Sequence, residues 1–353
     1  LSASLTGQIV SGANRDYLFW LFLVGFGVKA GVIPLHVWLP EAHPAAPGNI
    51  SALMSAVLIT AGIYGLFRVC AFGLGTPETH WGLAVMGLGT LSAILGVLYA
   101  LAQSDLRRLL AYSTIENAGI ILLGLGAGMT LLAVNRHELA VVAICASLLH
   151  VLNHAACKGL LFLGAGSVVA ATGTRRIEEL GGLLKRMPLT GLFFLIGAMA
   201  IAGLPPLNGF VSEWLTFQSL LLGFQFVPGL TRVNFPLAGA ILALTSALAA
   251  VCFVKAFGTS FLALPRSRAA ETAHESPATM VIPMGMLALT CLALGLFPGT
   301  VLSILEHVTA SLPGLPRTSG LVHSATTIAV GAGPFAMVTP LALALTVLAG
   351  LIV

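Results

Sequence analysis

The segment LLHVLNHAACKGLLFLG, residues 148–164, decides the fold class. It lies in an apolar run over about residues 138–171, which is long enough for a membrane-spanning helix of roughly 20 residues. Within this run His150, His154 and Lys158 follow one another at helical spacing. At ~100° per residue the three side chains spread over only about 80° of the helix surface. The segment therefore predicts a membrane helix that carries one polar stripe.

The composition predicts a membrane location for the whole chain. Of 353 residues, 58% are hydrophobic and only 8% are charged, whereas soluble domains have roughly 25% charged residues. The mean hydropathy is +1.01. The formal charge is +4, but the 16 basic residues are scattered singly or in pairs, unlike the basic stripe of a nucleic-acid-binding protein. We expect an all-α, polytopic bundle in contact with the lipid bilayer, and no nucleic-acid partner.

Apolar runs predict about nine membrane segments. They lie near residues 17–39, 50–73, 82–102, 109–130, 138–171, 188–222, 236–263, 278–297 and 335–353. Gly31 and Pro34 interrupt the first run, and glycines and prolines between Gly203 and Gly209 interrupt the sixth. Such breakers predict two discontinuous helices, which are typical of ion pathways. A kink that serves packing alone is the alternative at each break.

Loop charges predict the orientation. Eight Lys and Arg residues fall in connections on one side of the predicted bundle and five on the other. This excess predicts that the loops at 103–108, 172–187 and 264–276 face the cytoplasm. The stretch 298–334 is predicted to be mostly irregular, with an amphipathic piece near 301–312.

Ionisable residues inside apolar runs indicate function, because a charge in hydrocarbon costs at least ~2.5 to 3.5 kcal/mol. Lys29 lies next to the break in the first run and could exchange a proton there, or extend to the interface. His150 and His154 lead to Lys158 and are predicted to form a proton relay. Metal or haem ligation and a purely structural polar stripe are the alternatives for this group.

Three further ionisable residues lie in other runs. Glu213 follows the break in the sixth run, where it could hold a proton or serve as a cap or ion-pair partner. Glu116 lies in the fourth run and Lys255 in the seventh. Lys255 could pair with either acid or extend to the interface. His36, Glu41 and His43 follow the first run and could admit protons or be ordinary interfacial residues.

The cysteines offer no redox or metal motif. All five lie inside apolar segments without CxxC spacing, at positions Cys70, Cys145, Cys157, Cys252 and Cys291. We therefore expect small apolar core residues, and no cofactor or metal in this chain.

Four segments together resemble a known family. They are GVKAGVIPLHVWLPEAHPAAPGNISALMS (27–55), DLRRLLAYSTIENAG (105–119), HVLNHAACKGLLFLGAGSV (150–168) and GLPPLNGFVSEW (203–214). The residues in these segments, and the order of the segments along the chain, resemble the proton-translocating antiporter module shared by respiratory complex I, membrane-bound hydrogenases and Mrp-type sodium/proton antiporters. The details of STIENAG, PPLNGFVSEW and FVKAFG look most like the hydrogenase-4 and formate hydrogenlyase branch.

The resemblance implies a bundle with two half-channels, discontinuous helices that carry Lys29 and Glu213, and a central hydrophilic axis through His150, His154 and Lys158. Three features depart from the family pattern. Thr60 stands where complex I members often have a lysine, and others have a histidine near Ser55. The family's preceding helices, with a glutamate thought to pair with the lysine that Lys29 matches, are absent, so we expect an N-terminally truncated chain.

The resemblance predicts a proton-translocating membrane subunit of a redox-driven complex of the hydrogenase or NADH:quinone oxidoreductase type. Residues 1–262 would form the translocation core and 263–353 the C-terminal helices and loop. Iron-sulfur, nickel-iron or flavin centres would lie in peripheral redox subunits, which join other membrane subunits as partners. The inner membrane of a prokaryotic cell is the expected location. A sodium/proton antiporter subunit and a non-transporting anchor for a peripheral oxidoreductase are the alternatives.

Overall fold

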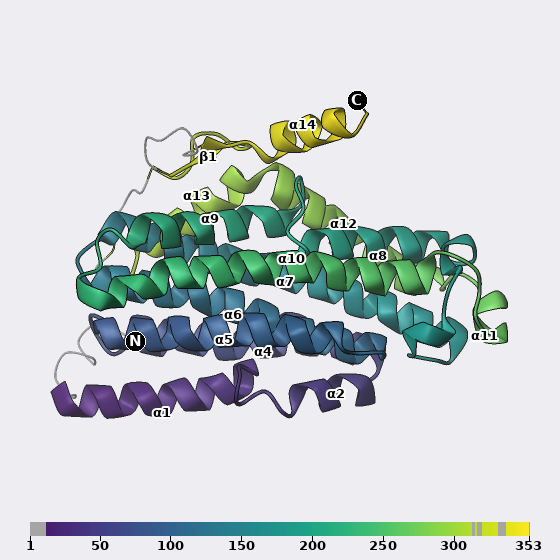
Figure 1. Ribbon diagram of the computed structural model, residues 1–353, viewed down its shortest axis with the longest axis horizontal. Helices are drawn as coiled ribbons and strands as arrows, with labels where there is room; N and C mark the ends of the chain where they lie inside the picture. The colour runs from purple at the N-terminus through teal and green to yellow at the C-terminus, as the bar shows by residue number, and fades with distance from the viewer. Residues whose placement is uncertain (1–11, 313–314, 316–319, 331–336, 353) are drawn as a thin grey trace.

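The computed structural model describes residues 12–312, 315, 320–330 and 337–352, and long helices that run alongside one another make up most of this part of the chain (Figure 1). The chain begins with α1 (Gly12–Ala30), α2 (Leu39–Ala45), α3 (Gly48–Leu53) and α4 (Ile59–Gly65). Next come α5 (Thr79–Leu101), α6 (Leu106–Ala133) and α7 (His137–Thr172). The remaining helices are α8 (Pro188–Ile201), α9 (Asn208–Gly223), α10 (Asn234–Phe261), α11 (Arg268–Glu271), α12 (Ala278–Leu296), α13 (Pro298–Ala310) and α14 (Pro340–Ile352).

Six helical segments of the described residues are long and apolar enough to cross a membrane. They are Gly48–Ala71, Thr79–Leu101, Leu106–Ala133, His137–Thr172, Gly229–Phe261 and Ala278–Leu296. The other three predicted segments correspond to α1 with α2, to α8 with α9, and to α14, all of which are shorter or more highly charged. The helical membrane bundle is confirmed, whereas the count of nine membrane segments stays a prediction.

Helix α6 lies at the centre of the bundle. Its apolar segment is entirely buried, and it packs against both α5 and α7. Small residues permit the close approach of α5, as in other membrane helix pairs. A Cβ atom on Gly89 of α5 would lie 2.7 Å from the Gly119 carbonyl oxygen and 2.7 Å from the Leu123 nitrogen of α6. The two backbones are therefore in direct contact.

Both sequence breaks coincide with the ends of helices. Helix α1 ends at Ala30, and Gly31 follows with φ +68°. Helix α8 ends at Ile201, Gly203 has φ +66°, and α9 begins at Asn208. A positive φ is easily adopted only by glycine, and proline cannot continue the hydrogen-bond ladder of a helix. The local sequence therefore accounts for where these helices end.

The segment Gly48–Ala71 is helical throughout but not uniformly α-helical. Between α3 and α4 lies a π-helical stretch, η1 (Met54–Leu58), and a second one, η2 (Leu66–Ala71), follows α4. Single π turns re-aim side chains and occur often at functional sites. In η1 the buried Ser55 hydroxyl lies 2.8 Å from the Thr114 hydroxyl of α6. Thr60 in α4 instead hydrogen-bonds to carbonyls of its own helix.

The three loops predicted to be cytoplasmic meet at one end of the bundle. Leu106 N–H donates to the Arg175 carbonyl, and Ile177 N–H donates to the Ser104 carbonyl. Arg266 N–H donates to the Leu180 carbonyl. The short 3₁₀ helices η3 (Ile177–Glu179) and η4 (Leu183–Lys185) belong to this end, which also carries α11. These contacts confirm that the loops share one side.

The C-terminal part contains more regular structure than predicted. Helix α13 matches the amphipathic piece expected near 301–312, and β1 (Ile328–Ala329) pairs antiparallel with β2 (Met337–Val338). A third 3₁₀ helix, η5 (Gly229–Val233), precedes α10. The two-residue strands are the only departure from the all-α prediction in the part of the chain that the structure describes.

The α5–α6 contact makes a testable prediction about stability. Gly89→Ala places a methyl group against the α6 backbone and should lower the free energy of unfolding by about 1–3 kcal/mol through overpacking. Gly87→Ala is the matched control on α5, because a Cβ there meets nothing within 4 Å. Thermal unfolding in detergent measures both variants. An unchanged midpoint for Gly89→Ala would contradict the direct backbone contact.

Candidate functional site

A row of buried polar side chains on α7 forms the centre of the candidate site. The predicted stripe is present: His150, His154 and Lys158 are 2%, 1% and 0% exposed. Asn153 and Cys157 lie on the same stripe and are also buried. Because α7 packs against α6, α9 and α12, the stripe faces protein rather than the bundle surface. The predicted relay residues are therefore brought together on one buried face.

His150 connects three helices. Its Nδ1 lies 2.9 Å from the Ser212 hydroxyl of α9, and its Nε2 lies 3.2 Å from Asn117 Oδ1 of α6. An amide oxygen only accepts hydrogen bonds, so Nε2 is the nitrogen that carries the hydrogen in this arrangement. The Asn117 amide group is itself oriented, since its Nδ2 donates to the Ser113 carbonyl at 2.8 Å. In the neutral imidazole, Nδ1 is then free to accept from Ser212.

The Ser212 hydroxyl lies within hydrogen-bonding distance of two possible acceptors. Its hydroxyl lies 3.1 Å from the Gly209 carbonyl as well as 2.9 Å from His150 Nδ1. Asn153 Nδ2 donates to the same hydroxyl oxygen at 2.8 Å and to the Asn208 carbonyl at 2.8 Å. The single hydroxyl hydrogen can therefore point to the carbonyl or to the imidazole, according to whether Nδ1 carries a proton.

Lys158 has no close counter-ion. Its Nζ donates to the Leu110 carbonyl at 3.3 Å and lies 5.6 Å from the centre of the Phe253 ring. Glu116 is close enough to interact electrostatically, but among the described residues no carboxylate lies within 4 Å of Lys158. Glu116 is 1% exposed, and its Oε2 has no hydrogen-bond partner in the described part of the chain.

The break between α8 and α9 positions Glu213. This carboxylate is 6% exposed and accepts a hydrogen bond from the Ser246 hydroxyl of α10 at 2.6 Å. A Cβ atom on Gly203 would lie 3.0 Å from Glu213 Oε2, so the turn between α8 and α9 passes directly beside the acid. Glu213 is buried in the second half of the interrupted run, as the sequence predicts.

Lys255 has neither of the acidic partners considered for it. Its Nζ donates to the Leu101 carbonyl at 2.8 Å and to the Gln103 carbonyl at 3.0 Å. Leu101 is the last residue of α5 and Gln103 follows its C-cap, so the ammonium lies where a cation is favoured by the unpaired carbonyls of a helix end. The structure thus places Lys255 as a cap on α5.

Lys29 lies apart from the buried row. It is in the last turn of α1, and its side chain is exposed. Among the described residues it has no hydrogen bond or ion pair. The sequence predicts the position of Lys29 beside a helix end, but the structure does not bring it into contact with the α7 stripe.

His43 is a buried member of the site whose place sequence reasoning left open. It lies on α2, is 0% exposed, and its ring stacks on Phe162 of α7 with centroids 4.4 Å apart. Burial, with the nearby Lys158 ammonium as a second cause, lowers the pKa of His43 to about 4. His36 is less buried and faces Tyr99 and Tyr112, and Glu41 pairs with Arg108.

Asn117, Ser212 and Ser246 were not singled out from the sequence. Each is an uncharged residue in an apolar helix, and only its position opposite an ionisable residue on another helix reveals its role. A search for hydroxyl and amide residues within one turn of Glu116 and Glu213 could have found the first two.

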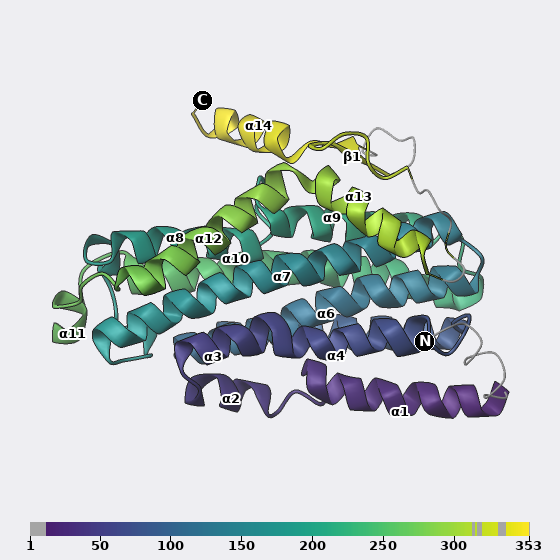
Figure 2. The same ribbon diagram turned by 180° about the vertical axis from the view of Figure 1, so that it is seen from behind.

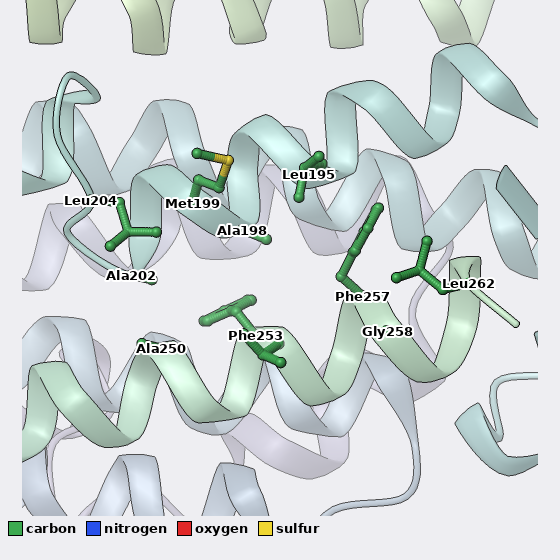
Figure 3. Close-up of a pocket in the computed structure, with 11 residues that line it drawn as sticks. Leu195, Ala198, Met199, Ala202, Leu204, Ala250, Phe253, Phe257, Gly258 and Leu262 are labelled. Carbon is green, nitrogen blue, oxygen red and sulfur yellow. The ribbon is translucent and has the colours of Figure 1, made fainter. Parts of the chain in front are cut away.

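A separate apolar pocket of about 290 Å³ lies between α8 and α10 (Figure 3). Phe253, Phe257 and Met199 form much of its wall. None of its lining residues is titratable. Phe253 lines this pocket, and Lys158 Nζ lies 5.6 Å from the centre of its ring. In the described residues, no group of three or more His, Cys, Asp or Glu side chains could hold a metal ion.

Comparison with known proteins places this chain in a family. The sequence profile described as "NADH:quinone oxidoreductase/Mrp antiporter, TM" matches residues 3–231. Hydrogenase-4 component B of Escherichia coli is 45% identical over 98% of this chain and 52% of its own length. Formate hydrogenlyase subunit 3 of the same organism is 43% identical over 81% of this chain and 47% of its own.

A solved structure agrees with the sequence relatives. A chain of the membrane-bound sulfane sulfur reductase, an archaeal respiratory membrane complex, superposes with a TM-score of 0.79 at 30% identity, over 96% of this chain and 53% of that one. The chain spans about half the length of the curated relatives it matches. It is an integral membrane protein that belongs to the transmembrane family of NADH:quinone oxidoreductase and Mrp antiporter subunits.

Proposed function

We propose that this chain is part of a proton-translocating membrane subunit of a redox-driven complex, of the hydrogenase or NADH:quinone oxidoreductase type. Family membership and the names of its relatives support this proposal. The observation that carries it is the position of His150, which is buried and hydrogen-bonded on both ring nitrogens to groups of two other helices. A histidine held in this way can gain and lose a proton without losing its partners.

The proton step at His150 follows from its two contacts. In the neutral state, Nε2–H donates to Asn117 and Nδ1 accepts from the Ser212 hydroxyl. When a proton arrives at Nδ1, Ser212 turns its hydrogen to the Gly209 carbonyl and its oxygen accepts from Nδ1–H. Both states keep their hydrogen bonds, so the free-energy cost of burying either one is reduced.

The next groups of the proposed path are His154 and Lys158. Each lies one helical turn from its predecessor, and His154 interacts electrostatically with both His150 and Lys158. His154 has no hydrogen-bond partner on either ring nitrogen among the described residues, so its protonation is not tied to a fixed partner. Lys158 would store the proton, and Glu116 would offset its charge. Metal or haem ligation by the two histidines is not favoured, because the ammonium lies beside them.

Glu213 and Lys29 would serve the two ends of the path. Glu213 follows one helix break and Lys29 precedes the other, and we propose that both breaks are discontinuous membrane helices of a nine-segment bundle. The exposed Lys29 would receive its counter-group from outside the described residues. Residues 1–262 would form the translocation core and residues 263–353 the C-terminal helices. Lys255 would have a structural role, because its ammonium caps the C-terminal end of α5.

The proposal includes partners. Other membrane subunits and peripheral redox subunits would assemble with this chain, and iron-sulfur, nickel-iron or flavin centres would reside in those redox subunits. The inner membrane of a prokaryotic cell is the proposed location, with the loops that contain Arg107, Arg175 and Arg266 on the cytoplasmic side.

Lys158→Ala should abolish most proton transport. In inverted membrane vesicles that contain the complete complex, we expect at least a tenfold lower rate of interior acidification per donor oxidised, because no other group on the stripe can store a proton stably as an ammonium. Lys185→Ala, an exposed lysine of η4, is the matched control and should behave as wild type. Undiminished acidification in Lys158→Ala would favour a non-transporting anchor.

Ser212→Ala tests the hydroxyl contact. The variant removes the group that exchanges a hydrogen with His150 Nδ1, so we expect proton transport to slow several-fold while the complex still assembles. Ser219→Ala is the control, since Ser219 is equally buried on α9 and donates only to the Thr216 carbonyl of its own helix. Equal rates for the two variants would rule out the proposed exchange.

A sodium/proton antiporter subunit is the second candidate, because the family includes Mrp antiporters. The buried row offers ammonium and imidazole groups, and the described residues place only two buried carboxylates in the bundle, Glu116 on α6 and Glu213 on α9. A hard cation prefers several oxygen ligands at one place. We therefore expect proton flux in the same vesicles to be unaffected when potassium replaces sodium in the buffer. Flux that requires sodium would support the antiporter.

A further inference from the structure

A groove of about 650 Å³ lies between α3, α7 and α12, away from the polar row. Figure 2 shows these three helices on one face of the bundle, toward the end that carries α11. The residues that line it include Asn49, Arg107, Leu163, Val169, Met280 and Pro283. Its floor is formed where α3 crosses α7, since a Cβ on Gly48 would lie 2.8 Å from Gly166 Cα.

Arg107 is the only charged side chain in the lining of this groove. It is 8% exposed. Its Nη1 donates to the Ala46 carbonyl at 2.8 Å, but its Nε has no partner in the described part of the chain. A guanidinium group has five N–H donors in a planar fork, and a buried donor without an acceptor is costly. The groove therefore contains unused, positively charged hydrogen-bonding capacity.

The nearby acids in the described chain make no ion pair with Arg107, although Asp105 interacts with it electrostatically. Asp105 accepts from the backbone N–H groups of Arg107 and Arg108, and its carboxylate lies 3.3 Å from Arg175 Nε. Glu41 pairs with Arg108. Among the described residues, no carboxylate lies within 4 Å of the Arg107 guanidinium. The positively charged Arg107 guanidinium therefore has no anionic partner in ion-pair contact among the described residues.

The rest of the groove indicates what kind of anion this is. Leu163, Val169, Met280 and Pro283 are apolar, and they belong to helices α7 and α12, which can both cross a membrane. A free phosphate ion would gain nothing from these walls, whereas an acyl chain would bury apolar surface against them. Basic pockets between membrane helices on the cytoplasmic side are suited to anionic lipid head groups.

We propose that this groove binds an anionic phospholipid, with its phosphodiester on the Arg107 guanidinium and an acyl chain between α7 and α12. The planar fork of arginine matches two oxygens of a phosphate. The loops at this end carry the larger share of Lys and Arg, which predicts the leaflet that is rich in anionic lipid. The site is separate from the proton path and does not depend on the proposed function.

The test is lipid binding to the complete, delipidated protein in detergent, followed by native mass spectrometry with phosphatidylglycerol as probe. We expect Arg107→Gln to weaken phosphatidylglycerol binding about tenfold, which corresponds to the loss of one charged contact. Ala170→Leu fills the groove from α7, because Ala170 lines it, and should also weaken binding. Arg186→Gln, an exposed arginine at the same end, is the matched control and should bind as wild type.

Two further measurements test whether both the charge of the head group and the acyl chains of the lipid contribute to binding. Phosphatidylcholine should bind more weakly than phosphatidylglycerol, and millimolar inorganic phosphate should not displace the lipid. Equal binding of both lipids, or displacement by phosphate, would overturn the proposal. If Arg107→Gln no longer elutes as a monodisperse protein, the Ala170→Leu variant provides the test. Wild-type affinity of Ala170→Leu for phosphatidylglycerol would also overturn the proposal.

Discussion

Close packing of α5 against α6 sets the surroundings of the buried polar groups. A Cβ atom on Gly96 would lie 2.6 Å from the Glu116 nitrogen, so the two backbones meet at the level of the acid. No side chain of α5 can intervene at that point, and the remaining faces of α6 are covered by other helices. Glu116 and Asn117 are consequently held at a fixed depth, where α7 and α9 complete the site.

The bilayer imposes the second constraint, because hydrocarbon offers no hydrogen bonds to polar groups. His150 meets this demand by bonding to Asn117 of α6 and Ser212 of α9, and Asn117 also donates to the Ser113 carbonyl of its own helix. His154, His43 and one oxygen of Glu116 do not meet it within the described residues. His150 is thus hydrogen-bonded on both ring nitrogens, whereas a change of charge on His154 would break no hydrogen bond to a described residue.

Sequence reasoning succeeded where the information is local. The spacing of His150, His154 and Lys158 places them on one helix face, and glycine and proline mark the ends of α1 and α8. It could not assign partners across helices: Ser212 lies 62 positions from His150 in the chain, and Lys255 bonds to carbonyls 154 and 152 positions away. Nor could it show that Lys29 is exposed in the described chain, because periodicity does not tell which side of a helix a neighbour covers.

The weak pairing of Lys158 is consistent with a transport role. An ammonium locked in a tight ion pair would be stable, but releasing its proton would leave an unpaired buried carboxylate, at a cost of several kcal/mol. Lys158 instead has one long hydrogen bond to a carbonyl, an aromatic ring at 5.6 Å and an acid beyond 4 Å. The carbonyl and the ring offset part of the cost of burying the ammonium, and both remain neutral when the proton leaves. A proton carrier needs this balance, whereas a structural ion pair does not.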